Sequence, residues 1–175
     1  KVSASSIGAV VAGLRELKAL ASKMPAAATA VALQEAAIEA LQEAGTRAMA
    51  AILPAECVQP DPGKARRYDA ALLFLIFPLE VVGDAMANRI VEDVLLHLRG
   101  DLGIRRYLGD SFWCAEYRSK LPRHRRTSDW SGDIATRNAL CGPGEEAEWC
   151  LFDPLLAIIF GRRCRRLHTS EWCAA

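Results

Sequence analysis

The chain has 175 residues, of which 51% are hydrophobic, and 22 basic residues nearly balance 21 acidic ones. This composition is typical of a globular protein of about one domain and excludes a mainly disordered or collagen-like chain. The net charge of +1 implies no global attraction to nucleic acid or to an anionic membrane. The longest charge-free apolar run, residues 70–79, is about half the length of a membrane-spanning helix, so we expect no membrane segment.

Apolar residues recur at helical spacing through the N-terminal half of the chain. Residues 5–23 and 29–54 predict two amphipathic helices, and Gly45 in the second apolar stripe indicates close packing or a weak point. Residues 68–79 are apolar on every face, which favours a helix that is buried all round. Residues 83–99 predict another amphipathic helix.

The C-terminal half alternates between irregular and apolar sequence. Residues 101–144 show no long period and predict a long loop region, with a short hairpin around residues 104–117; loops of this length are usually functional. Residues 146–160 predict an apolar helix kinked at Pro154. The resulting pattern of five helices predicts an all-α fold of stacked helical pairs, in which outer helices are amphipathic and inner ones apolar.

Six cysteines permit disulfides, but this is not a short secreted framework. Cys150 lies in the predicted apolar helix, where we expect it to point inward as a small hydrophobe. Reduced thiols and a cytoplasmic setting are therefore favoured over an oxidised framework. Cys164, His168 and Cys173 include no C-x-x-C pair, so we expect no metal and no cofactor.

Two groups of residues are candidates for a functional site. Arg105, Arg106, Tyr107 and Asp110 in the glycine-flanked loop offer the planar donors, carboxylate and aromatic face that a sugar site needs, and Phe112, Trp113 and Tyr117 add aromatic surface. The alternative, which the residues alone favour, is an Arg106–Asp110 ion pair that locks the loop.

A second candidate group is formed by Glu145, Glu146 and Glu148, which lie at the predicted start of a helix. A helix N-terminus stabilises a carboxylate and would keep a general base ionised. The alternative is a set of ordinary first-turn acids that complement the helix dipole.

Basic residues cluster in residues 118–126 and 162–166. These clusters are compatible with a phosphate- or RNA-binding patch and with a solvated or protein-docking face. Asp129 and Asp133 dilute the first cluster, so the docking face is favoured and no nucleic-acid partner is expected.

Four segments, in the same order, together resemble glycoside hydrolase family 15 and its relatives, the regulatory α and β subunits of phosphorylase kinase. They are SASSIGAVVAGLRELKAL, YDAALLFLIFPLEVV, GDLGIRRYLGDSFWCAEY and GEEAEWCLFDPLLAIIFG, which reach from residue 3 to residue 161. The third resembles the family's G-x-x-G-x-x-R-Y-x-G-D-x-Y stretch, and the fourth its G-x-E-A-x-W-C-x-F-D-P helix. The resemblance is closest to the kinase-like branch.

This resemblance implies an α/α toroid of six helical pairs that acts on α-linked glucans or trehalose. Active members invert the anomeric centre with two carboxyl groups, an acid and a base that activates water. The family's base position matches Glu146. The resemblance also implies a carbohydrate ligand and calmodulin binding, and the residues expected to bind substrate are Arg106, Tyr107, Asp110, Trp113 and Glu148.

The sequence also departs from the family pattern. The family's acid lies on a Trp-Glu motif just before the Ser-Ser-x-Gly helix, a motif that this sequence does not contain. One carboxylate does not support the two-carboxylate reaction, and five helices do not close a toroid of twelve.

We therefore expect residues 1–161 to form the C-terminal part of a glucoamylase-like toroid that is incomplete in this chain, followed by a basic tail over residues 162–175. The expected function is a non-catalytic regulatory or structural subunit that packs against another protein chain or against the missing part of the toroid. The alternatives are a fragment of an active inverting α-glucosidase or glucoamylase and a structural protein that reused the fold.

Overall fold

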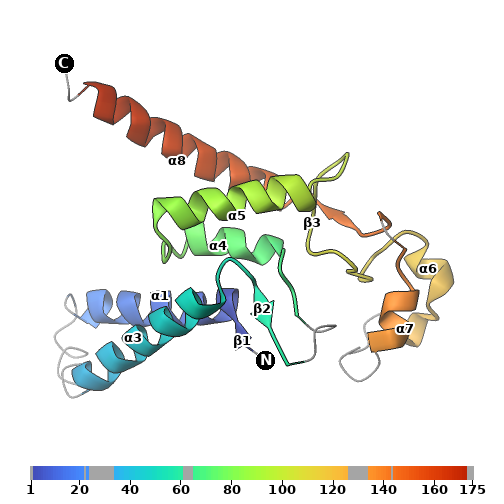
Figure 1. Cartoon of the computed structure of the whole chain (residues 1–175), viewed down its shortest axis with the longest axis horizontal. Coiled ribbons are helices and arrows are strands. Elements are labelled where there is room, and N and C mark those ends of the chain that lie inside the picture. Colours follow the sequence, from blue (N-terminus) through green and yellow to red (C-terminus); the bar gives the residue numbers. More distant parts are fainter. Residues whose placement is uncertain are drawn as a thin grey trace. The chain divides into compact units, whose positions relative to one another are not determined.

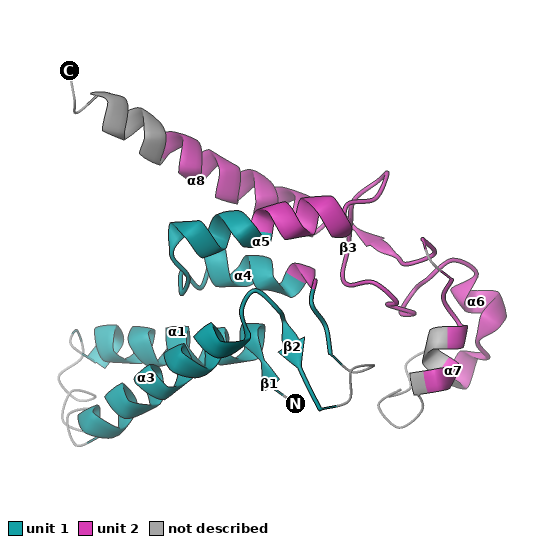
Figure 2. Ribbon diagram, in the orientation of Figure 1, with its two compact units in different colours: residues 1–67, 71–90 teal, residues 68–70, 91–175 magenta. Residues whose placement is uncertain are grey.

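The computed structural model describes residues 2–21, 23, 34–60, 65–125, 134–142 and 144–172. This part of the chain is mostly helical, with two small antiparallel sheets (Figure 1). It divides into two compact units, Lys1–Arg67 with Ala71–Ile90 and Tyr68–Ala70 with Val91–Ala175 (Figure 2). The elements are β1 (Val2–Ser3), α1 (Ala4–Ala21), α3 (Glu35–Ile52), β2 (Cys57–Val58), the 3-10 helix η2 (Ala70–Leu72), α4 (Leu73–Ile76), α5 (Asp84–His97), β3 (Ile104–Arg105), α6 (Tyr117–Lys120), the 3-10 helix η3 (Arg123–Arg125), α7 (Ile134–Ala139), β4 (Glu148–Trp149) and α8 (Phe152–Trp172).

Helices α1 and α3 form an antiparallel pair in the first unit. A Cβ atom at Gly45 of α3 would lie 2.6 Å from Cγ2 of Val11, near the middle of α1. Near the end of α1, the Lys18 ammonium lies 2.7 Å from the carboxylate of Glu39 and 3.5 Å from that of Glu35. Both predicted helices are confirmed over these ranges, and Gly45 marks a close approach of the two helices.

The start of α1 is held by the carboxylate of Glu56, which lies between α3 and β2 along the chain. Glu56 is buried, and its side chain accepts hydrogen bonds from the amide of Ser5 (3.0 Å), the hydroxyl of Ser5 (2.6 Å) and the hydroxyl of Ser3. Strand β1 pairs with β2 in the register Val2–Val58 and Ser3–Cys57. A carboxylate at a helix N-terminus is stabilised by the free amides there, so Glu56 fixes α1 to the small sheet.

The helix predicted over residues 68–79 is wrong in extent and burial. Only η2 and the short α4 form there, because Phe77 precedes Pro78 and is extended (φ −150°, ψ 131°). A proline disfavours the helical conformation of the residue before it. Leu73 and Leu75 are buried, but the ring of Phe74 is 37% exposed, so the segment is not buried on every face.

Helix α5 confirms the amphipathic helix predicted over residues 83–99. Its inward face is buried, and Arg89 on the helix and Arg99 just after it are exposed. The buried side chains on this face and just after it are Ile90, Val91, Val94 and Leu98.

The hairpin predicted within residues 104–117 is wrong. Strand β3 instead pairs with β4, in the register Ile104–Trp149 and Arg105–Glu148. The chain turns just before β3, where the Gly100 amide donates to the Gly103 carbonyl over 2.8 Å. The partner of β3 is therefore a segment far along the chain, which a local turn pattern does not reveal.

The helix predicted from residue 146 begins later, at Phe152, and α8 runs to Trp172. Pro154 therefore lies in the first turn of α8, where backbone amides have no carbonyl partner within the helix. Its lack of an amide hydrogen breaks no helical hydrogen bond, so the expected kink has no cause there. Cys150 is exposed in the turn before the helix, and its predicted inward position is wrong. Among the described helices, none has the length and apolarity that crossing a bilayer requires.

Two glycines of α1 give a matched test of this packing. A Cβ at Gly8 would collide with Leu75 Cδ2 and come within 3.2 Å of Val81 Cγ2, whereas a Cβ at Gly13 meets nothing within 4 Å. Because Leu75 is fully buried, we expect Gly8→Ala to destabilise the chain by about 1–3 kcal/mol. Gly13→Ala should stabilise it by about 0.5–1 kcal/mol through helix propensity. Thermal unfolding followed by circular dichroism measures both, and equal shifts for the two variants would contradict the packing.

Candidate functional site

The Glu148 side chain in β4 closes the glycine-rich turn before β3. Its carboxylate accepts hydrogen bonds from the amides of Leu102 (2.7 Å), Gly103 (2.9 Å) and Asp101 (3.3 Å). A Cβ at Gly100 would collide with this carboxylate, so the turn requires glycine there. The hydrogen bond from Leu102 lowers the pKa of Glu148, and those from Gly103 and Asp101 lower it further.

Glu146 lies just before β4 and is also bound by backbone amides. Its Oε1 accepts from the Gly109 amide over 2.9 Å and its Oε2 from the Gly144 amide over 3.1 Å. The Arg105 Nε atom lies 3.6 Å from Oε2, and the Glu146 side chain is only 4% exposed. The expectation that Glu145, Glu146 and Glu148 begin a helix is wrong, since α8 starts at Phe152 and the donors are loop amides.

Arg106 and Asp110 form the ion pair that was the alternative at the sequence level. Two parallel hydrogen bonds join Arg106 Nε and Nη2 to the Asp110 carboxylate, at 2.7 and 2.8 Å. Asp110 is 1% exposed and also accepts from the Phe112 amide over 3.2 Å. The hydrogen bond with Asp110 raises the pKa of Arg106, and the two parallel bonds tie together the ends of the turn that precedes Phe112.

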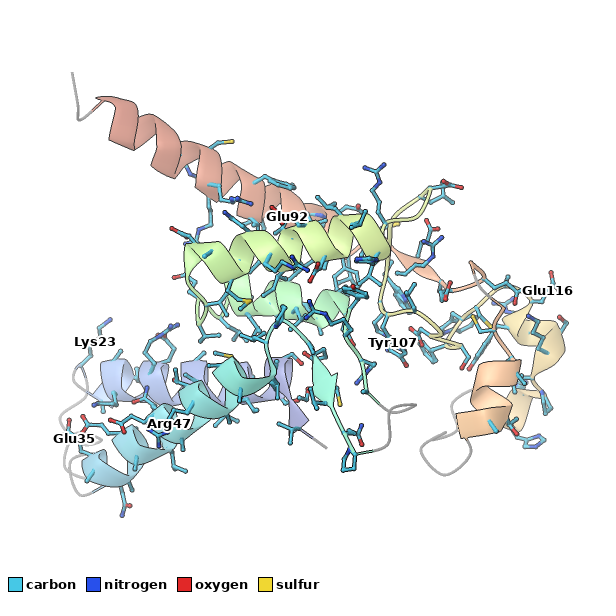
Figure 3. The ribbon with its side chains drawn as sticks, in the orientation of Figure 1. Lys23, Glu35, Arg47, Glu92, Tyr107 and Glu116 are labelled. Atoms are coloured by element: carbon cyan, nitrogen blue, oxygen red, sulfur yellow. The ribbon has the colours of Figure 1, made fainter. Side chains whose placement is uncertain are left out.

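Aromatic rings surround the Arg106 guanidinium. Its Cζ atom lies 5.3 Å from the ring centre of Tyr107, 5.4 Å from that of Phe112 and 6.0 Å from that of Trp149. The rings of Phe112 and Trp149 are parallel, 3° apart, at a centroid distance of 6.0 Å. Figure 3 labels Tyr107 on the segment that follows β3. Cation–π contacts of this kind add to the ion pair with Asp110.

Trp113 extends this aromatic cluster toward solvent. Its ring is 46% exposed and lies 5.1 Å from the ring of Tyr117 and 6.2 Å from that of Phe112. The Arg118 guanidinium lies 5.7 Å from the Trp113 ring centre. The backbone of Trp113 is left-handed, with φ +57°, a conformation that costs a bulky residue about 1–3 kcal/mol.

The structure thus brings the predicted residues together in one unit, but in two subsets. Arg106, Tyr107 and Asp110 form one cluster, to which Trp113 is joined through Phe112. Glu146 and Glu148 meet at Arg105, which contacts both carboxylates.

One residue of the site, Trp149, was not among those selected from the sequence. Trp149 follows Glu148 in the matched segment, and this proximity along the chain was the one signal for it. Its role depends on the pairing of β3 with β4, which brings it to the strand that carries Arg105.

The described residues include no group of three or more His, Cys, Asp or Glu side chains that could hold a metal ion. Of the cysteines and histidine weighed as a metal site, Cys164 is exposed, and the His168 side chain and Cys173 lie outside the described residues.

Comparisons with family models, with curated proteins and with solved structures find no match to this chain. A functional assignment therefore depends on the geometry of the chain's own residues. In that geometry, the two segments with the glycine-rich and the Trp-Cys motifs, residues 100–117 and 144–161, lie against each other through β3 and β4.

The carboxylate of Glu148 predicts a specific acid dependence. Its folded-state pKa is lowered, so its stabilising contribution is complete above the unfolded-state pKa of about 4.3 and is lost as the pH falls through the lower folded value. We expect Glu148→Gln to lower stability by about 1–3 kcal/mol at pH 7, and the difference from the unsubstituted chain to shrink toward pH 3.

Thermal unfolding across this pH range measures the effect of Glu148→Gln. Glu92→Gln is the control, because Glu92 is an exposed residue of α5 (labelled in Figure 3). Parallel pH profiles for Glu148→Gln and the unsubstituted chain would show that this carboxylate does not hold the turn.

Proposed function

We propose that this chain is a non-catalytic, glucoamylase-like domain that acts as a regulatory or structural subunit of a larger assembly. In this proposal its helices are part of an α/α toroid completed by another chain or by further helices. The observation that carries the proposal is the state of Glu146, the residue at the resembled base position.

A general base must present a free oxygen lone pair to the water that it activates. Each oxygen of Glu146 accepts one hydrogen bond from a backbone amide, and because the side chain is only 4% exposed, its remaining lone pairs do not face solvent. These contacts join the loop before β4 to the glycine-rich loop after β3. The geometry favours a role for Glu146 as a bracket between two loops.

Asp110, a second buried carboxylate among the candidate residues, also accepts several hydrogen bonds. Asp110 is bound by two hydrogen bonds from Arg106 and one from the Phe112 amide, and the Arg106 guanidinium is itself surrounded by aromatic rings. Loss of Arg106 would leave the buried Asp110 carboxylate without its two shortest hydrogen bonds. Neither Glu146 nor Asp110 is thus poised to transfer a proton to substrate.

Exposed apolar side chains in each unit support a role in assembly. In the first unit, Val10, Leu17 and Leu20 lie at helical spacing along α1 and are 61%, 43% and 54% exposed. In the second unit, Ile158 and Phe160 of α8 are also exposed. Contiguous apolar surface of this kind marks protein–protein contacts, and a neighbouring helical pair in a toroid would cover it.

The proposed setting is the cytoplasm, where reducing conditions keep thiols free. Support comes from the cysteines that the structure describes, Cys57, Cys114, Cys141, Cys150 and Cys164, all of which are unpaired thiols.

Catalytic and bracket roles for Glu146 predict different effects of Glu146→Gln. We expect the purified chain to release no glucose from maltose or trehalose, and the substitution to lower stability by about 1–3 kcal/mol because charged hydrogen bonds to two loops are lost. Glu43→Gln is the control, since that exposed side chain pairs with Arg47 one turn along α3, and its loss should leave stability nearly unchanged. Glucose release that Glu146→Gln abolishes would overturn the proposal in favour of an inverting α-glucosidase.

Assembly through α1 predicts that the chain alone associates. We expect light scattering after size exclusion to give a mass above that of the 19.1 kDa monomer. Val10→Gln with Leu17→Gln should reduce this association, because polar side chains remove the apolar surface without changing buried contacts. Glu16→Gln on the same helix should leave it unchanged. A sharp monomer peak with cooperative melting for the unsubstituted chain would contradict the expected association.

A further inference from the structure

Two cysteines of the second unit share one small core. Cys114 is 3% exposed and lies in a cluster with Tyr117 and Leu121, against which Leu140 and Cys141 pack. The Cys114 Sγ lies 3.5 Å from the carbonyl oxygen of Leu140, the residue next to Cys141. The Cys141 thiol donates a hydrogen bond to the carbonyl oxygen of Gly142 over 3.5 Å.

Contacts that involve neither sulfur hold the two cysteine-bearing segments together. The Ala115 amide donates to the Glu145 carbonyl over 2.8 Å. Lys120 Nζ donates to the Leu140 carbonyl over 2.9 Å and to the Glu145 carboxylate over 2.7 Å. These contacts hold both cysteines at one small core, and this proximity favours formation of a bond between the two sulfur atoms.

We propose that Cys114 and Cys141 are a redox-sensitive pair that a peroxide closes into a disulfide. The Cys114 thiolate attacks a peroxide oxygen, the O–O bond breaks, and a sulfenic acid and water result. The Cys141 thiolate then attacks the sulfenic sulfur, the S–O bond breaks and a second water leaves. Overall the two thiols lose two electrons and two protons, and one hydrogen peroxide becomes two waters. This inference is independent of the proposed function.

The surroundings of the thiols set the order and the speed of these steps. Burial raises the pKa of Cys114, while the nearby Lys120 cation acts to lower it. Burial, together with the nearby carboxylates of Glu146 and Glu145, raises the pKa of Cys141 to about 12. Cys114 is therefore the first nucleophile, and both groups are thiols at neutral pH. Since the thiolate reacts, the rate should rise about tenfold per pH unit between pH 7 and pH 9.

The disulfide would join the segment that carries Trp113 to the segment that carries Glu145 and Glu146. In the reduced chain that contact rests on hydrogen bonds, and in the oxidised chain it would be covalent. The exposed residues Arg118, Lys120 and Arg123 lie between the two cysteines. Trypsin fragments cut there should stay joined in the oxidised chain until a reductant is added.

The experiment uses the full chain with Cys150→Ser and Cys164→Ser, which removes the exposed thiols that the structure describes. Hydrogen peroxide is added at pH 7 and at pH 9, free thiols are alkylated under denaturing conditions, and the chain is cut after Lys, Arg and Glu. Mass spectrometry should find residues 107–116 linked to residues 138–145, with formation about a hundredfold faster at pH 9. The link should vanish on reduction.

Matched variants and an unfolded control identify the pair. Adding Cys114→Ser or Cys141→Ala should each abolish the link, and circular dichroism of the reduced variants checks that they fold. Chain denatured before oxidation should lose the preference for this pair. Cross-links to other cysteines in the folded unsubstituted chain, or Cys114 oxidised to sulfinic acid with Cys141 still a free thiol, would overturn the proposal.

Discussion

Backbone amides of two loops bind the carboxylates of Glu146 and Glu148, and the rest of the candidate site depends on these bonds. Glu148 takes the amides of the turn before β3, and Glu146 takes one amide from the loop after β3 and one from its own loop. Hydrogen bonds to charged groups are among the stronger ones in proteins. They hold together segments that are separated along the chain and that the short β3–β4 pairing also joins.

The same bonds limit what the site can do chemically. A carboxylate that accepts several amide hydrogen bonds stabilises its surroundings but offers fewer lone pairs to water or substrate. The Asp110 carboxylate likewise accepts hydrogen bonds from Arg106, and the Arg106 guanidinium lies 5.3 Å from the ring centre of Tyr107 and 6.0 Å from that of Trp149. Residues that carry acid–base chemistry in hydrolases are used in this chain to fix loop conformation, a use that fits a domain whose role is assembly.

Close packing of small residues has the corresponding role in the first unit. Gly8 and Gly45 let α1 approach α4 and α3 to distances that side chains would prevent, and Glu56 ties the start of α1 to β2. The opposite face of α1 carries exposed valine and leucine. A helical pair that is tightly packed on one side and apolar on the other is suited to lie between neighbours.

The sequence by itself determined the amphipathic helices and the Arg106–Asp110 pair, since these depend on residues three to seven positions apart. It overestimated the helix around Leu75, where Pro78 enforces an extended residue before it, and it placed the start of the last helix too early. Only the tertiary structure decided the partner of β3, the Gly109 amide that binds Glu146, and the meeting of Cys114 with Cys141. Each of these joins segments far apart along the chain, and such contacts leave no periodic signal because they are selected by the combined packing and hydrogen bonding of the whole unit.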